Sequence, residues 1–429
     1  MVVRLARGRV HYAWIVFGVT FFTLLAAAGI RSTPGVLIVP LEHEFGWTRA
    51  EISLAVGINL LMFGLCGPFA AALMARFGVR RVLLCALLLI AAGVGLTTAI
   101  RQPWQLDLLW GFVVGTGTGS MAGVLAATVA NRWFVARRGL VIGILTAAGA
   151  TGQLVFLPVL ATLAVNQGWR WASLTVALAA LAAVPVVALL MRDDPARIGL
   201  RPYGAAEDFK GPSTVGNPFA AALSGLGRGV RSIDFWLLST SFFICGATTN
   251  GLVGTHLIPA SVDHGIPEVT AAGMLALIGL FDVVGTTVSG WLTDRVDSRW
   301  LLFWYYGLRG LSLLLLPFAL SSTYLVLLLF IVFYGLDWVA TVPPTIALST
   351  SIFGREQAAI IFGWIFAAHQ FGAAFAAFAA GALRTWLGDY QVTFLTAGLL
   401  CLIASGLVIR IGRASRGERP ARPLAPEAA

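Results

Sequence analysis

The sequence predicts an all-α polytopic membrane protein, with twelve transmembrane helices in two pseudo-symmetric six-helix bundles. Hydrophobic residues make up 58% of the chain and charged residues 11%, against about a quarter charged in soluble domains. The mean hydropathy is +0.87. Apolar runs of about twenty residues, the length that crosses a bilayer, recur along the whole chain. A soluble fold is excluded because so few charges could not cover its surface.

Twelve apolar segments can be delimited in chain order. The first six are 12–40, 50–74, 81–100, 106–130, 138–163 and 170–191. The second six are 232–258, 268–292, 300–320, 323–350, 357–381 and 388–411. An even number of spans places both termini on the same side of the membrane.

The basic residues predict which side that is. With both termini inside, 23 of the 29 Lys and Arg residues lie in cytoplasmic segments, and four lie in outer loops: Arg49, Arg101, Arg170 and Arg384. Cytoplasmic loops of membrane proteins are enriched in Lys and Arg. We therefore expect cytoplasmic termini in a cell membrane, and we interpret the net charge of +10 as topology rather than nucleic-acid binding.

A polar stretch divides the spans into six and six. Residues 192–231 are rich in Pro and Gly, so we expect a cytoplasmic linker between an N-terminal bundle, 1–191, and a C-terminal bundle, 232–411. Within it, 219–231 could be a short helix on the inner membrane surface or a solvated connector. The Pro- and Arg-rich tail, 412–429, should be disordered.

The two halves repeat short motifs. ALMARFGVRR follows span two and GWLTDRVDSR follows span eight, which aligns Arg76 with Arg295, Arg80 with Arg299 and Ala75 with Asp294. A parallel repeat of two six-span halves is an architecture of secondary transporters, with the substrate site between the halves near the midplane.

The sequence resembles the major facilitator superfamily over its whole length. The loops LMARFGVRR and LTDRVDSR are similar to the superfamily's cytoplasmic loop motif, whose Asp and Arg form an inter-helix latch. HYAWIVFGVTFF, FGWTRAEIS and RWFVARRGLVIGILTAAGATGQ resemble the monocarboxylate and oxalate/formate branch. The resemblance implies the major facilitator fold and alternating-access transport of a small organic anion, such as a monocarboxylate, with a proton.

The resemblance also places a cytoplasmic latch and shows two departures. The latch positions are Arg76, Arg80, Asp294, Arg295 and Arg299. Ala75 replaces the usual latch Asp, so the latch of the first half should be weak. Gly111 stands where many proton-coupled members carry an Arg in span four, so the chain lacks that coupling Arg.

Ionisable residues at membrane depth are costly, at about 2.5–3.5 kcal/mol each, and functional by default. The five in this chain are Arg31, Asp282, Arg309, Asp337 and His369. By the resemblance, Asp282 matches a family acid involved in proton coupling, and Asp337 is the second candidate for that role. The family's substrate-binding Arg should follow Asp282 by four residues, but this position holds Thr286.

The two arginines each keep two interpretations. Arg309 lies on a peripheral span by the family pattern. It could neutralise Asp282 or Asp337 as a structural ion pair, since buried charges usually pair, or take part in function. Arg31 has no acidic partner in its own span, and the resemblance places it on a cavity-lining helix. It either contacts a substrate anion or extends toward the outer headgroups.

Uncharged polar groups complete the candidate binding site. His369 is either a satisfied core residue or a proton or anion contact, and Gln370 follows it in span eleven. Further candidates in cavity-type spans are Asn59, Gln153, Asn250 and Thr249. Each of these alone fits an interhelical hydrogen bond better than a binding role.

Motifs for catalysis and cofactors are missing. The chain has no GxxxxGK[ST] or HExxH pattern, and GTGTG at 115–119 lies within a span. We predict no enzyme, cofactor, metal or nucleic-acid partner. The expected partners are a small-molecule substrate, protons and the bilayer, for a monomeric chain. The alternatives are efflux of an amphipathic compound and, from another class, a non-transporting membrane sensor.

Overall fold

The computed structural model describes residues 11–121, 123–206, 218–322 and 324–412. These residues are helical apart from turns, the connector 191–206, in which only Ala196–Ile198 forms a helical turn, and one isolated bridge between Phe134 and Tyr203. The tail predicted to be disordered therefore lies almost wholly outside the described residues.

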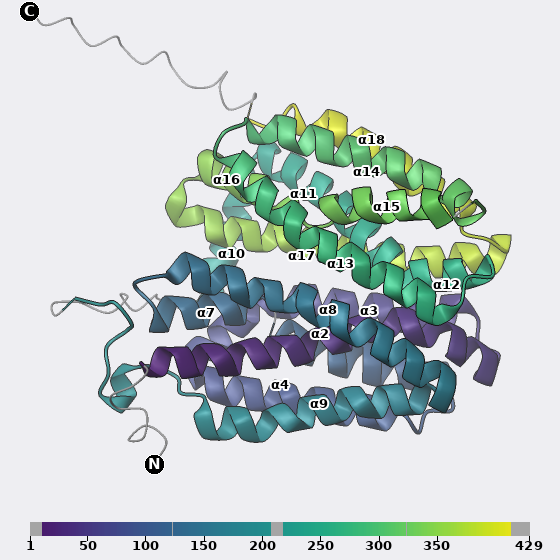
Figure 1. Ribbon diagram of the computed structural model, residues 1–429. Coiled ribbons are helices and arrows are strands. Elements are labelled where there is room, and N and C mark those ends of the chain that lie inside the picture. Colours follow the sequence, from purple (N-terminus) through teal and green to yellow (C-terminus); the bar gives the residue numbers. More distant parts are fainter. Residues whose placement is uncertain (1–10, 122, 207–217, 323, 413–429) are drawn as a thin grey trace, which may run out of the picture.

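Two bundles of helices lie against each other, coloured purple to blue and green to yellow (Figure 1). The first, here called the N-half, contains α2 (Tyr12–Phe45), α3 (Arg49–Phe77), α4 (Val79–Thr97), α5 (Pro103–Leu106), η1 (Asp107–Val114), α6 (Gly115–Gly119), α7 (Gly123–Trp133), α8 (Arg138–Gln167) and α9 (Trp169–Leu190). The second, the C-half, contains α11 (Ile233–Gly246), η3 (Ala247–Val253), α12 (Gly254–Asp263), α13 (Glu268–Thr293), α14 (Ser298–Leu320), α15 (Tyr324–Asp337), α16 (Val342–Phe353), α17 (Arg355–Leu387) and α18 (Gln391–Val408).

The all-α membrane class is confirmed. Within the described residues, ten segments are long and apolar enough to cross a membrane. The other two predicted spans correspond to α8, with 30 residues, and to the interrupted segment from α5 to α7. The helix α2 starts and α18 finishes at the same end of the molecule, at the left of Figure 1. We call this the terminal end and the opposite one the far end.

Several spans are longer or more broken than hydropathy suggested. The helix α2 continues through Glu42 and Glu44 to Phe45, whereas the predicted span ended at 40. The predicted span 323–350 is two helices separated by the turn 338–341. Wide π-helical turns interrupt two other spans, at η1 and η3. Such turns often occur at functional sites.

The turn at the far end between α2 and α3 is fixed by local caps. Gly46 ends α2 with a φ of 67°, a left-handed conformation that glycine adopts without strain. Thr48 and Glu51 form a capping box at the start of α3, which satisfies free N–H groups of the first turn. These caps place Arg49 as the first residue of α3.

The linker contains the helix predicted as one of two alternatives. It is α10 (Pro218–Gly229), and it contacts both halves at the terminal end. The Phe219 ring stacks on Phe69 of α3, with centroids 5.6 Å apart. The indole N–H of Trp364, on α17, donates to the carbonyl of Ala222 at 2.9 Å. The linker therefore packs on the bundles here and is not simply a solvated connector.

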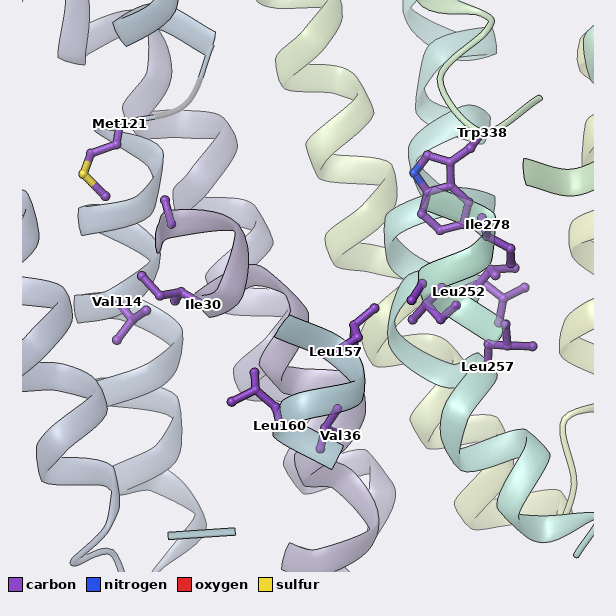
Figure 2. Close-up of a cluster of buried hydrophobic side chains, with 14 of the residues drawn as sticks. Ile30, Val36, Val114, Met121, Leu157, Leu160, Leu252, Leu257, Ile278 and Trp338 are labelled. Atoms are coloured by element: carbon purple, nitrogen blue, oxygen red, sulfur yellow. The ribbon is translucent and has the colours of Figure 1, made fainter. Parts of the chain in front are cut away.

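Apolar side chains fill both halves, and Figure 2 shows Ile30 and Met121 in the N-half and Leu252 and Ile278 in the C-half. Glycine permits close contact between the halves. A Cβ added at Gly64 of α3 would lie 2.5 Å from a side-chain carbon of α17. Small residues at such positions let membrane helices approach closely.

Candidate functional site

Arg31 is a charged residue within the apolar helix α2. It lies on α2 between the buried residues Ile30 and Thr33, yet its own side chain is exposed. Its guanidinium carbon lies 4.8 Å from the ring centroid of Phe63 on α3, which is cation–π distance. Within the described part of the chain, no hydrogen bond or ion pair of Arg31 is recorded. The arginine is held by an aromatic ring and keeps its donors available.

His369 and Gln370 bring unpartnered polar atoms from the C-half. Gln370 packs against α3, the helix that carries Phe63, because a Cβ added at Gly64 would lie 2.5 Å from a side-chain carbon of Gln370. The His369 ring packs on Phe242 and Phe366, at centroid distances of 4.8 and 5.7 Å. Its Nδ1 and the Oε1 of Gln370 are buried without a hydrogen-bond partner among the described residues. Such atoms are uncommon in folded proteins, so both are candidates for contact with a polar ligand.

Asp282 is held by neutral donors. Its Oδ1 accepts hydrogen bonds from Thr286 Oγ1 at 2.8 Å and from the backbone N–H of Val339 at 2.9 Å. Thr286, at the position where the resemblance predicted an Arg, therefore contacts the acid directly. Among the residues described, no salt bridge of Asp282 is recorded. Its carboxyl group combines burial with the absence of a fixed positive partner.

Arg309 and Asp337 form a buried ion pair between α14 and α15. Nε of Arg309 lies 2.6 Å from Oδ2 of Asp337, and the Arg309 side chain is 0% exposed. Nη2 also donates to the main-chain carbonyls of Asp337 and Trp338, at 2.5 and 3.2 Å. The structure thus brings together the pair predicted as one of two options for Arg309. The pair neutralises both charges inside the C-half.

The turn between α15 and α16 is held by side chains from α13 and α14. Arg309 binds carbonyls at the end of α15, Asp282 accepts the N–H of Val339, and Ser289 Oγ donates to the carbonyl of Ala340 at 2.6 Å. Backbone groups at a broken helix must be satisfied where water is absent. Asp282 and Arg309 consequently bind the same turn: Asp282 accepts a backbone N–H, and Arg309 donates to backbone carbonyls.

The neutral candidates differ in availability. Asn59 donates its Nδ2–H to the carbonyl of Trp110 in η1 at 2.8 Å, and Thr249 donates to the carbonyl of Cys245 at 2.7 Å. Asn250 lies half-buried on η3. Gln153 lies on α8, and its side chain is outside the described part. Asn59 and Thr249 thus make interhelical or local bonds, whereas no side-chain hydrogen bond of Asn250 is recorded among the described residues.

A family comparison decides the class of protein. The family model of the Major Facilitator Superfamily matches residues 19–346 and 238–428. The chain belongs to the major facilitator superfamily. It is therefore a multi-pass membrane transporter of that superfamily, as the sequence motifs indicated.

Relatives within the major facilitator superfamily cover nearly the whole chain. Monocarboxylate transporter 13 of Rattus norvegicus is 29% identical over 93% of this chain and 89% of its own length. The oxalate:formate antiporter of Oxalobacter formigenes is 23% identical over 93% and 92%. The crystal structure of a D-xylose-proton symporter superposes with a TM-score of 0.75 at 14% identity, over 96% of this chain and all of the other. That structure supports the fold.

The residues of the predicted cytoplasmic latch make contacts with nearby groups. Arg299 pairs with Asp297 at 2.7 Å, and Arg295 bonds the carbonyl of Trp291 at 3.0 Å. The N–H of Arg80 donates to Asp193 at 2.9 Å, while Arg76 lies over the neighbouring ring of Phe77. Asp294 is exposed at the end of α13. The recorded contacts stay within one half or its adjoining connector, and the latch role stays a prediction.

Sequence reasoning missed a group of charged residues at the far end of this superfamily member. Arg49 contacts Glu42 and Asp263, and Arg384 also contacts Asp263. The available signal was topological, because Arg49 and Arg384 are two of the few basic residues predicted on the outer side. Arginines retained against the positive-inside rule merit a search for acidic partners.

Proposed function

We propose that this transporter is a secondary active carrier that moves a small organic anion, such as a monocarboxylate, together with a proton by alternating access. The observation that carries the proposal is the Arg31 guanidinium, which lies over the Phe63 ring and has no recorded counter-ion among the residues that the structure describes. The names of the relatives, a monocarboxylate transporter and an oxalate:formate antiporter, support the same substrate class.

Arg31 is the proposed anchor for the anion. A guanidinium presents a planar fork of N–H donors that matches a carboxylate. The unpartnered Nδ1 of His369 and Oε1 of Gln370 supply polar contacts from the opposite half, and Asn250 is a further candidate. An anion bound to Arg31 would therefore link the two halves, as required of a site that alternates between two openings.

Asp282 is the proposed proton carrier. Asp337 is already engaged with Arg309 at 2.6 Å, so its charge has a fixed partner. Asp282 contacts neutral donors, and a proton can join or leave it without breaking an ion pair. A change at Asp282 would also reach the turn between α15 and α16 through Val339.

The proposed orientation puts both termini in the cytoplasm, and the far end outside, because the basic residues concentrate at the terminal end. The proposed setting is a cell membrane, specifically a bacterial inner membrane, with the protein as a monomer. Cysteines introduced at Arg76 and at Trp386, both exposed, should react with membrane-impermeant reagents from opposite sides. Labelling of both from one side would contradict this orientation.

Substitution of Arg31 tests the function. We expect Arg31→Gln to weaken binding of the transported anion by at least about tenfold, because charge-assisted hydrogen bonds contribute about 1.5–3 kcal/mol each. Arg31→Lys should be intermediate, since an ammonium is a point charge without the fork. The measurement is a binding titration of the purified protein, with an anion chosen from small mono- and dicarboxylates by thermal stabilisation.

Arg101→Gln is the matched control, because Arg101 is exposed in the turn between α4 and α5 and has no role in the proposed site. It should bind the anion normally. Normal binding by both Arg31 variants would remove the physical support for anion transport. Efflux of a neutral or cationic amphiphile would then be the better assignment.

A further inference from the structure

Arg49 at the far end joins the two halves through a buried bidentate ion pair. It is the first residue of α3, and its side chain is 5% exposed. Nη1 and Nη2 lie 2.7 and 2.6 Å from the two carboxylate oxygens of Asp263, the last residue of α12. Nε donates to Glu42 of α2 at 2.9 Å. One arginine thus connects an acid of its own half with an acid of the other.

A second cation and an aromatic hydroxyl complete this cluster on the C-half. Arg384 of α17 donates through Nε to Oδ2 of Asp263 at 2.8 Å. The Tyr390 hydroxyl lies 3.1 Å from Nη1 of Arg49 and 3.1 Å from Nδ1 of His256. We call Glu42, Arg49, Asp263, Arg384 and Tyr390 the far-end cluster.

The polar contacts between the halves are concentrated here. Among the hydrogen bonds recorded for the described residues, those that join the N-half to the C-half arise at the first two residues of α3. Ala50, the second residue of α3, donates its N–H to Thr385 Oγ1 at 3.2 Å. The Cβ of a residue replacing Gly381 would collide with Ser53, so α3 and α17 pack closely beside the cluster.

The cluster is suited to hold a closed end that can also open. Separation of α3 from the C-half must break the bidentate contact with Asp263, the contact with the Tyr390 hydroxyl and the Ala50 bond together. A buried ion pair adds little net stability over an apolar pair, and each charge here also has a partner on its own half: Glu42 for Arg49 and Arg384 for Asp263. When the halves part, neither charge is left alone.

We propose that the far-end cluster is the outer gate of the transporter, closed in this structure and open when the substrate site faces outside. The inference rests on the alternating access and orientation of the proposed function. It adds the residues that hold one of the two states, and it does not depend on the identity of the substrate.

Distances between spin labels on opposite halves test the gate. Exposed positions at the far end are His43 on α2 and Trp386 on α17, each changed to Cys. Cys66 and Cys85 are replaced by Ala in this background, while the buried Cys245 and Cys401 are kept. We expect Arg49→Gln and Asp263→Asn each to raise the ratio of long to short distances about tenfold, as the loss of one charged hydrogen-bonding partner implies.

The matched control is Arg170→Gln. Arg170 pairs with Glu44 at 2.6 Å at the same end, but both residues belong to the N-half, so the distances should not change. Arg49→Gln and Asp263→Asn are both used so that, if one variant fails to fold, the other still tests the gate. Unchanged distances in a folded variant, or an equal change in Arg170→Gln, would overturn the gate.

Results for the gate and for Arg31 can be separated because the distances are measured without substrate. A shifted distance distribution together with normal anion binding by Arg31 variants supports the gate and rejects the anion assignment. Arg49→Lys should keep part of the short distance if the charged pair itself closes this end, because an ammonium retains the charge but not the bidentate fork. A folded Arg49→Lys variant that shifts the distances as far as Arg49→Gln would count against a role of the charge in closing this end.

Discussion

We expect Asp282→Asn to abolish substrate uptake driven by a pH gradient while leaving substrate exchange measurable. An asparagine cannot carry the proton. Its amide oxygen can still accept the bonds that Asp282 receives from Thr286 and Val339, so the turn between α15 and α16 should keep its geometry. Uptake and exchange are measured on the same proteoliposomes, with and without an imposed gradient.

Asp389→Asn is the control for this substitution. Asp389 is an exposed acid in the C-half, and its Oδ1 accepts the N–H of Gln391 at 2.9 Å, a bond that asparagine can also make. Both activities should persist in this variant. Unaltered pH-driven uptake in Asp282→Asn would end the assignment, and Asp337 would become the candidate carrier.

Breaking the buried pair of the C-half should have the largest effect on stability. Asp337→Leu leaves the Arg309 guanidinium buried without its carboxylate, and loss of one partner of a buried pair costs about 3–5 kcal/mol. The double variant Asp337→Leu with Arg309→Met should recover part of this loss. Recovery should be incomplete because Arg309 also binds the carbonyls of Asp337 and Trp338. The stability loss of the single variant and its recovery in the double variant are both measured by unfolding the purified protein in detergent.

Arg197→Gln supplies the comparison for stability. Arg197 pairs with Asp193 at 3.1 Å, and its side chain is 72% exposed. Exposed pairs contribute about 0–1 kcal/mol, so this variant should unfold almost as the parent does. A similar small effect from Asp337→Leu would show that the Arg309 pair does not hold the turn.

Hydropathy predicted the spans well and their interruptions poorly. The segment containing α15 and α16 is apolar on both sides of its turn, so no drop in hydropathy marks the break at 338–341. The signal that was present is Pro343 near the start of α16, because proline favours the first turn of a helix. The bonds from Asp282 and Arg309 that satisfy this turn come from two other helices and could be found only in the structure.

The candidate site was predictable where buried charge or helical spacing restricted the possible partners, and the pair of Arg309 with Asp337 was one of the two options for Arg309. The spacing of Asp282 and Thr286 by four residues predicted a shared face, and their side chains do meet. The contact of Arg49 with Asp263 spans 214 residues, and sequence spacing carries no information at that range. The sequence identified Arg31 because a charge within an apolar span is costly. Only the structure could show that no counter-ion of Arg31 is recorded among the described residues.

Uptake of a labelled small monocarboxylate into proteoliposomes tests the central claim most directly. The vesicles contain only this protein and are made more alkaline inside than outside, with protein-free vesicles as the baseline. Proton-coupled anion transport predicts accumulation above the external concentration, loss of accumulation when the gradient is collapsed, and loss in Arg31→Gln. Vesicles that accumulate no member of a mono- and dicarboxylate panel above the baseline, while the same protein moves an amphipathic cation, would contradict it.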